Sequence, residues 1–241
     1  MTRLSIKTKL PLGLAWIWVK SSFAMFREKP VNFMFFGFSF VIFSVLPFLG
    51  AFFATLVVVR MLLSAREIAE GRNIGTSLDF KTIFAQRNIV SYAIFCVGYD
   101  LIAMSIMSNL LSHWGIDSSI PANLMDHRVL YLIIGMSLFR TLFFGISLVF
   151  ITFNPVLNVL NSLRLSWIFI FKNIVVVTLG LFLLLPFLLL PIYIMLLVTL
   201  SMTNPVLFGV SFFILAIFLL LFLVITTLFS FKLYQDGVLH E

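Results

Sequence analysis

Six long apolar runs occupy most of this 241-residue chain and decide what it can fold into. An unbroken apolar run of about 17–25 residues is the length that crosses the hydrocarbon of a bilayer as a helix. Such runs leave no polar face for water, so they predict helices embedded in lipid. We therefore expect an all-α protein, a six-span transmembrane helical bundle, in a single integral membrane domain over residues 1–241. The predicted spans are about 31–48, 50–69, 89–111, 129–153, 174–200 and 206–231.

The composition agrees with this interpretation. Hydrophobic residues make up 62% of the chain and charged residues 10%, against about 45–50% and about 25% in soluble domains. A soluble fold would lack the polar surface needed to cover its core. This excludes a soluble enzyme, a nucleic-acid-binding domain and a disordered scaffold. The single cysteine, Cys96, excludes a disulfide framework and a multi-cysteine metal site.

Two short turn segments join neighbouring spans, at residues 46–50 (LPFLG) and 201–205 (SMTNP). Proline cannot donate a backbone hydrogen bond and glycine tolerates open geometry, so both segments predict tight turns at a membrane edge. The spans then form three helical hairpins. Pro186 and Pro191 fall inside the fifth predicted span and should kink it.

The basic residues outside the spans gather on one side of the predicted membrane. Thirteen Lys and Arg lie in the N-terminal segment, the 70–88 connection with its approach, the 154–173 connection and the tail. The other side has Arg128, in a loop that also holds Asp117 and Asp126. Since cytoplasmic loops carry the excess of Lys and Arg, both termini are predicted to be cytoplasmic.

Residues 1–30 are predicted to contain an interfacial helix on the cytoplasmic surface. Lys20 and Arg27 lie off a single apolar face. That face consists of Leu12, Trp16, Val19, Phe23 and Phe26. A basic start followed by a short apolar stretch could also be a signal peptide, but Trp16, Trp18 and the early Lys20 oppose this. We expect a retained amphipathic helix with its tryptophans at headgroup depth.

A short pattern, [IM]-F-x-x-[KR]-[NP]-[IV], precedes the first, third and fifth spans, at residues 25–31, 83–89 and 168–174. Upstream of the third copy lies a second amphipathic stretch, with Asn154 placed to cap it and Pro155 in its first turn. Each copy then predicts an interfacial helix, a basic anchor and a descent into the bilayer. The alternative is that basic and aromatic residues recur at any cytoplasmic membrane boundary, without a true duplication.

Three charged residues fall inside predicted spans: Asp100, Arg140 and Arg60. A lone charge at the bilayer centre costs about 2.5–3.5 kcal/mol on insertion scales, so these side chains are not expected to face lipid. We expect Asp100 to bridge Arg140, Arg60 or both, with Tyr99 and Ser137 as further partners. Arg60 lies shallower if the second span is shifted. The cluster is either a structural lock between helices or an anionic-substrate or ion site.

No motif indicates catalysis, a cofactor or a metal. His113 and Asp117 are one helical turn apart, but no metalloprotease pattern accompanies them. The nucleophile-elbow, P-loop and Rossmann patterns do not occur in the sequence. We therefore predict that the protein is not an enzyme, with no catalytic residues, no cofactor-binding residues and no metal site.

The chain resembles the YciC-like family of polytopic bacterial inner-membrane proteins. The resemblance rests on the helix of residues 16–26 running into Lys29-Pro30, on the turn at 46–50, on residues 154–166 with the Lys172-Asn173 exit, and on the tail around Tyr234. This chain departs from the family in its far larger number of Phe residues. The resemblance implies a location in the bacterial inner membrane; it implies no activity and no functional residues.

These observations predict a multi-pass inner-membrane protein that acts as a structural or regulatory membrane component. The alternative is a small transporter or channel that uses Asp100, Arg140 and Arg60. The expected partners are the lipid bilayer and other membrane proteins, with no nucleic acid. The sequence leaves the oligomeric state open.

Overall fold

The computed structural model describes residues 4–46, 49–75, 77–116, 127–140, 144–201 and 205–240. Within these residues the chain is helical apart from one small antiparallel sheet, so the predicted all-α class is confirmed. The helices are α1 (Gly13–Glu28), α2 (Pro30–Ser44), α3 (Gly50–Ala69), α4 (Phe80–Phe84), α5 (Arg87–His113), α6 (His127–Arg140), α7 (Ile146–Phe153), α8 (Val159–Lys172), α9 (Ile174–Ser201) and α10 (Pro205–Gly237). The two strands, β1 (Leu4–Ile6) and β2 (Val238–His240), pair with each other.

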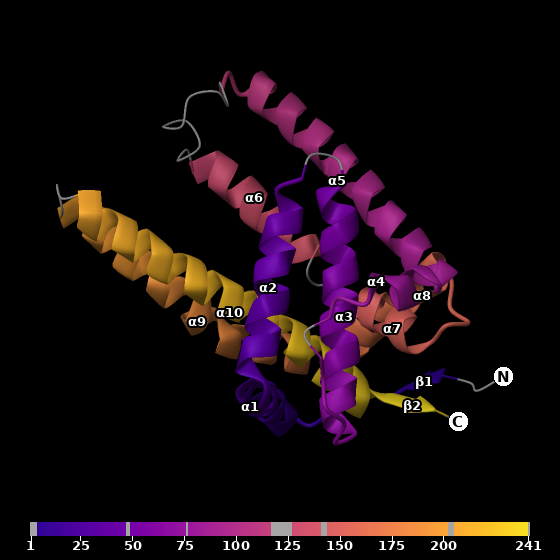
Figure 1. The fold of residues 1–241 in the computed structure, drawn as a ribbon. Coiled ribbons are helices and arrows are strands. Elements are labelled where there is room, and N and C mark those ends of the chain that lie inside the picture. The colour runs from indigo at the N-terminus through magenta and orange to yellow at the C-terminus, as the bar shows by residue number, and fades with distance from the viewer. Residues whose placement is uncertain are drawn as a thin grey trace.

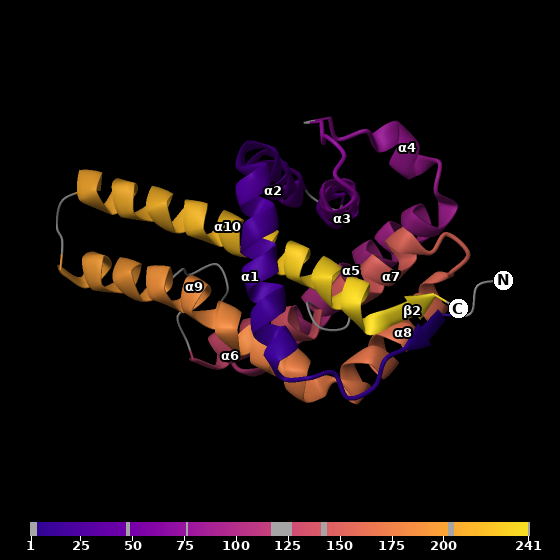
Figure 2. The same cartoon turned by 90° about the horizontal axis from the view of Figure 1, so that it is seen from below.

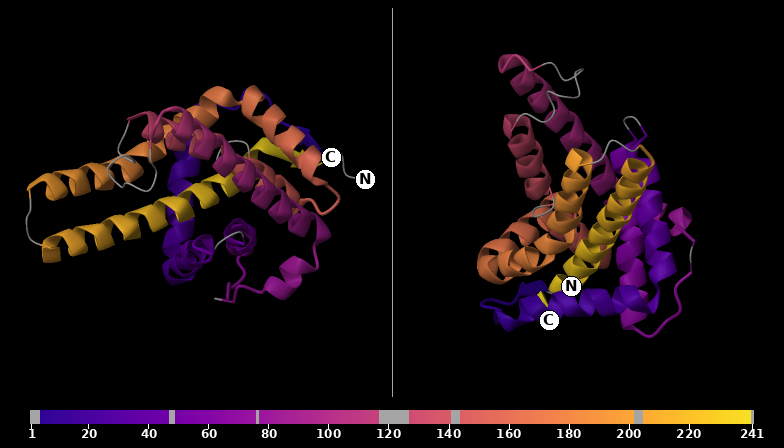
Figure 3. Two further views of the ribbon diagram at one scale, coloured as in Figure 1. Left: turned by 90° about the horizontal axis from the view of Figure 1, so that it is seen from above. Right: turned by 90° about the vertical axis from the view of Figure 1, so that its left-hand side faces the viewer.

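Helix α1 lies across one end of the long helices and contacts α2, α9 and α10. Helices α2 and α3 lie side by side as an upright hairpin, and α9 and α10 form a longer hairpin that leans away from them (Figure 1). Seen from below, α1 crosses both α9 and α10 (Figure 2). The two further views show α1 across the base of the other helices, close to both chain ends (Figure 3). The predicted N-terminal helix is therefore present and lies crosswise to the long helices.

Among the described residues, two helices are long and apolar enough to cross a membrane, Arg87–His113 and Gly209–Gly237. A third is added if Val159–Lys172 and Ile174–Phe187, which meet at 88°, form one broken span. Helix α2 is apolar but has only 15 residues. Two or three candidate membrane-spanning helices thus indicate a membrane protein.

The first predicted span is longer than the helix observed: it was expected over 31–48, but α2 ends at Ser44. The fourth was expected as one segment over 129–153. Helix α6 accounts for this segment through Arg140 and α7 accounts for it from Ile146, and residues 141–143 lie outside the described residues. The fifth predicted span corresponds to α9, which continues through Pro186 and Pro191.

All three copies of the repeated pattern lie where one helix gives way to the next. Lys29 separates α1 from α2, residues 85–86 separate α4 from α5, and Asn173 separates α8 from α9. In the first and third copies the helix before the break has the predicted amphipathic sequence, whereas α4 has only five residues. The pattern therefore marks a change of direction, which reaches 88° at the α8–α9 junction.

Asn173 holds the third of these junctions in place. Its buried side chain accepts a hydrogen bond from the Leu10 backbone N–H at 3.2 Å and donates to the carbonyl oxygens of Lys7 and Phe169 at 3.0 and 3.3 Å. Asn88, the corresponding residue of the second copy, donates to the Ile151 carbonyl oxygen at 3.1 Å. Both asparagines thus satisfy backbone groups of a distant segment at a point where the helical hydrogen-bond ladder is interrupted.

The predicted cap of α8, Asn154, is wrong: the cap is Asn158, another asparagine four residues further along the chain. Helix α8 begins at Val159, and the Asn158 side chain accepts a hydrogen bond from the Asn161 N–H at 2.8 Å. Asn154 instead lies at the end of α7, where it donates to the Phe150 carbonyl oxygen and to the Tyr234 hydroxyl, each at 2.9 Å. The side chain of Asn154 therefore joins α7 to α10 and is not available to start α8.

The N-terminal segment is attached to the end of α10. Strand β1 pairs with β2, and the Lys7 N–H donates to the Gly237 carbonyl oxygen at 3.0 Å. On α1, the indole N–H of the fully buried Trp18 donates to an Asp236 carboxylate oxygen at 2.8 Å. These contacts put residues 4–18 and 229–240 on one side of the molecule, although more than 200 residues of chain separate them.

Helix α9 approaches α10 closely at Gly180. A β-carbon added to Gly180 would overlap the ring of Phe229. That ring is buried and packs edge-on against Trp18, with 6.0 Å between ring centroids. Because Trp18 is held by its hydrogen bond to Asp236, it limits movement of the Phe229 ring away from Gly180.

We expect Gly180→Ala to destabilise the protein by about 1–3 kcal/mol, the usual cost of overpacking a filled core. The measurement is the midpoint of thermal unfolding in detergent. Gly98→Ala is the matched control, because it also lies within a long helix and its added β-carbon meets nothing within 4 Å. Equal midpoints for the two variants would contradict the close approach of α9 and α10.

Candidate site at the Asp100–Arg140 ion pair

Asp100 and Arg140 form an ion pair between two helices. Asp100 lies near the middle of α5 and Arg140 is the last residue of α6. The Arg140 Nη1 atom lies 3.0 Å from Asp100 Oδ1, and the two side chains are 41% and 22% exposed, respectively. The structure thus brings together two of the three charged residues singled out in the sequence.

Arg60 does not complete a three-residue cluster with them. Its Nη1 lies 3.3 Å from both carboxylate oxygens of Glu67, and its Nε donates to the Ser77 carbonyl oxygen at 3.0 Å. The guanidinium also lies over the Phe36 ring, 5.7 Å from the centroid. Arg60 is therefore directed toward the C-terminal end of α3 and the connection that follows it. The spacing of seven residues between Arg60 and Glu67 puts both on one helix face, and it is the sequence signal that could have identified this pair.

Arg140 borders two neighbouring cavities. One, of about 470 Å³, is lined by Asp100 and Tyr99 together with apolar residues of α2, α3, α5 and α6. The other, of about 320 Å³, is lined by Arg140, by α5 and by the hydroxyl-bearing residues Thr55, Thr226, Thr227 and Ser230. Phe40 also contributes to both cavities. The ion pair is thus located where internal space is available on two sides.

The hydroxyl groups in the second cavity are already engaged as donors. Each bonds to a backbone carbonyl of its own helix, Thr55 to Ala51, Thr227 to Leu223 and Ser230 to Thr226, at 2.7–3.0 Å. They therefore offer lone pairs, while Arg140 offers N–H groups. Sequence analysis missed this set, although Thr226, Thr227 and Ser230 at helical spacing share one face of α10.

Tyr92 ties α5 to the start of α7. Its buried hydroxyl lies 2.6 Å from the Phe144 carbonyl oxygen and 2.5 Å from Ser147 Oγ. The Ser147 hydroxyl also donates to the Phe144 carbonyl at 2.9 Å. These bonds satisfy buried polar groups at the start of α7. They form a tertiary contact between α5 and α7 that the sequence pattern did not indicate.

Aromatic rings cover the ion pair on one side. Tyr99 precedes Asp100 on α5 and packs against Phe139 and Phe144, with centroids 6.3 and 4.6 Å apart. Phe95 contacts Phe144 one turn earlier, at 5.6 Å. The predicted partner Tyr99 is therefore a packing neighbour of the site; the side chain of Ser137 lies outside the described residues.

The charged groups of the site do not form a metal-binding set. Among the described residues no group of three His, Cys, Asp and Glu side chains could hold a metal ion. Asp117 and Asp126, which were considered with His113, lie outside the described residues. What the arrangement provides is one anion paired with one cation, hydroxyl lone pairs and two open-sided cavities.

No family model, curated protein or solved structure matches this chain.

We expect Glu67→Gln to destabilise the protein, because it removes the anion beside a guanidinium whose side chain is 10% exposed. The expected loss in the free energy of unfolding is about 1–2 kcal/mol. This is less than the cost of breaking a fully buried ion pair, because Glu67 is partly exposed. Thermal unfolding in detergent gives the measurement.

Glu70→Gln is the matched control for Glu67→Gln, one turn further along the same segment. Glu70 is solvent-exposed and accepts hydrogen bonds from Arg66 and Arg72, which hold its pKa below the usual range. Removing its charge should lower the unfolding midpoint less than Glu67→Gln does. A larger effect at Glu70 would mean that the Arg60–Glu67 contact contributes little.

Proposed function

We propose that this protein is a YciC-like, multi-pass component of the bacterial inner membrane with a structural or regulatory role. In this proposal six spans form three hairpins, and the Asp100–Arg140 pair is the lock that joins α5 to α6. The observation that carries it is the 3.0 Å ion pair that joins Asp100, at the middle of α5, to Arg140 of α6. Helix α5 is one of the two described candidate spans.

The surroundings of the pair support a structural role. Arg140 lies in the last turn of α6 that the structure describes, and its charge is balanced by Asp100 of α5. In apolar surroundings, removal of either partner leaves an uncompensated charge, whereas removal of both does not. Such a pair favours one register between two helices over others.

The position of the basic residues supports cytoplasmic termini. Helices α1 and α8 each precede an apolar helix. Helix α1 carries Lys20 and Arg27, and α8 carries Arg164 and Lys172. The two chain ends pair through β1 and β2. An even number of spans returns the chain to the side on which it started, which agrees with six spans and a cytoplasmic location for both ends.

A transporter or channel is the second candidate, and the cavities on either side of Arg140 favour it. Interrupted helices with charged or polar groups at the break are common at the substrate sites of transporters. In this case Asp100 and Arg140 would bind or gate the transported species. Arg60 has a smaller part in this alternative, because it is paired with Glu67.

We expect Asp100→Asn and Arg140→Gln each to lower the thermal unfolding midpoint, by about 1–3 kcal/mol in free energy. The double variant should recover part of the loss, because it contains no unpaired charge. The measurement is a double-mutant cycle on the purified protein in detergent.

The cycle separates the two candidate functions. Single variants as stable as the wild type would contradict the structural lock. If Asp100→Asn then also abolished a proton or anion flux in proteoliposomes, the transporter would be the better proposal. Lys232→Gln removes a half-buried cation near the end of α10 and controls for the loss of one charge.

The proposed topology predicts which sites react from outside the cell. In a Cys96→Ala background, we expect Ser112→Cys to react with a membrane-impermeant maleimide on intact spheroplasts. Lys9→Cys and Arg72→Cys should react only after permeabilisation. All four positions lie within the described residues. Labelling of Lys9→Cys in intact spheroplasts would overturn the cytoplasmic N-terminus.

A further inference from the structure

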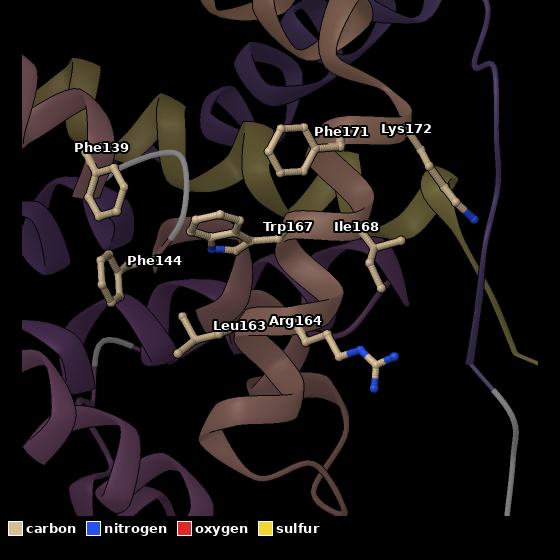
Figure 4. Close-up of a pocket in the computed structure, with 8 residues that line it drawn as sticks. All are labelled: Phe139, Phe144, Leu163, Arg164, Trp167, Ile168, Phe171 and Lys172. Carbon is tan, nitrogen blue, oxygen red and sulfur yellow. The ribbon is translucent and has the colours of Figure 1, made fainter.

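A wide groove runs along one side of α8. Its volume is about 780 Å³, and six of its eight lining residues are apolar. Figure 4 shows Leu163 and Trp167 of α8 pointing toward Phe139 of α6 and Phe144, just before α7. The apolar wall thus comes from two separate parts of the chain.

The remaining two lining residues are cations. Arg164 and Lys172 extend from the side of α8 turned away from Phe139 and Phe144, two helical turns apart, with Ile168 between them (Figure 4). Both are exposed. Within the part of the chain that the structure describes, neither forms a salt bridge, so their charges are available to an external anion.

The direction of α8 puts the groove at a defined depth. Helix α8 meets α9 at 88°. If α9 crosses the membrane, as the proposed function requires, α8 lies along the membrane surface. Trp167 and Phe171, which are 41% and 62% exposed, are then at the boundary between headgroups and acyl chains, where aromatic side chains are favoured.

We propose that this groove is a binding site for an anionic phospholipid. One acyl chain lies against Phe139, Phe144 and Trp167, and the phosphate group pairs with Arg164 and Lys172. The charge pattern favours this occupant, because a lipid supplies an apolar chain and an anion in one molecule. An apolar helix of another protein would cover the wall and leave both cations unmatched.

The bound chain would contact the aromatic cover of the ion pair. Phe139 and Phe144 form the far wall of the groove and also pack against Tyr99, next to Asp100. An acyl chain in the groove therefore supports both of these residues.

The test is quenching of Trp167 fluorescence by lipids with brominated acyl chains. The wild type and Trp167→Phe are reconstituted in phosphatidylcholine vesicles containing small fractions of brominated phosphatidylglycerol or brominated phosphatidylcholine. The difference between the two proteins isolates Trp167 from Trp16, Trp18 and Trp114. We expect half-maximal quenching at a several-fold lower fraction of brominated phosphatidylglycerol than of brominated phosphatidylcholine.

The double variant with Arg164→Gln and Lys172→Gln should abolish this preference for phosphatidylglycerol. Lys20→Gln with Arg27→Gln is the matched control, because it removes two cations from the other amphipathic helix, α1, and should keep the preference. Equal quenching by both lipids in the wild type, or a preference that survives in the Arg164 and Lys172 variant, would overturn the lipid site. Absence of quenching by either lipid would indicate that protein covers the groove and would also overturn it.

Flotation of the vesicles separates this inference from the proposed function on which it rests. A protein that floats with the vesicles and resists carbonate extraction, but shows no lipid preference, overturns the lipid site alone. A protein that does not insert overturns the membrane proposal. The unfolding midpoint of each variant confirms that loss of preference does not reflect loss of fold.

Discussion

The cost of bringing polar groups into apolar surroundings governs this structure. With one residue in ten charged, the protein has few ions, and the three that the sequence places inside predicted spans, Arg60, Asp100 and Arg140, are paired. Arg60 finds Glu67 on its own helix, whereas Arg140 finds Asp100 on a different one. The first contact can form as soon as α3 does. The second requires α5 and α6 to meet, so it selects among arrangements of helices that are otherwise similar in apolar character.

The same cost explains the polar residues at the helix junctions. Wherever a helix ends inside the protein, backbone groups lose their helical partners. At the α8–α9 junction Asn173 supplies partners to residues 7, 10 and 169; at the start of α7, Tyr92 and Ser147 bond to the Phe144 carbonyl. Each of these side chains comes from, or bonds to, an element far away in sequence. The changes of chain direction and the tertiary contacts are therefore made by the same residues.

Features that depend on local sequence could be predicted, and features that depend on distant contacts could not. The helical class, the amphipathic helices near residues 13–28 and 159–172 and the junctions at the repeated pattern follow from periodicity and from short-range residue preferences. The contact of Tyr92 with Phe144 and Ser147 does not, because these residues lie 52 and 55 positions further along the chain. The start of α8 was displaced from Asn154 to Asn158 for a similar reason: the Tyr234 hydroxyl, 80 residues away, is a partner that no local pattern reveals. Pairing of Arg60 with Glu67 was accessible from spacing alone, since both lie on one face of one helix.

The pairing of β1 with β2 joins the two ends of the described chain. Residues 4–6 can acquire their strand partner only after residues 238–240 have been made, so this segment must wait for one synthesised more than 200 residues later. Until then α1 also lacks Asp236, the acceptor for Trp18. During synthesis α1 can rest on the membrane surface by its exposed Leu12, Trp16 and Ile17, but its final position depends on α10. Helix α1 is therefore made well before the helix on which its docking depends.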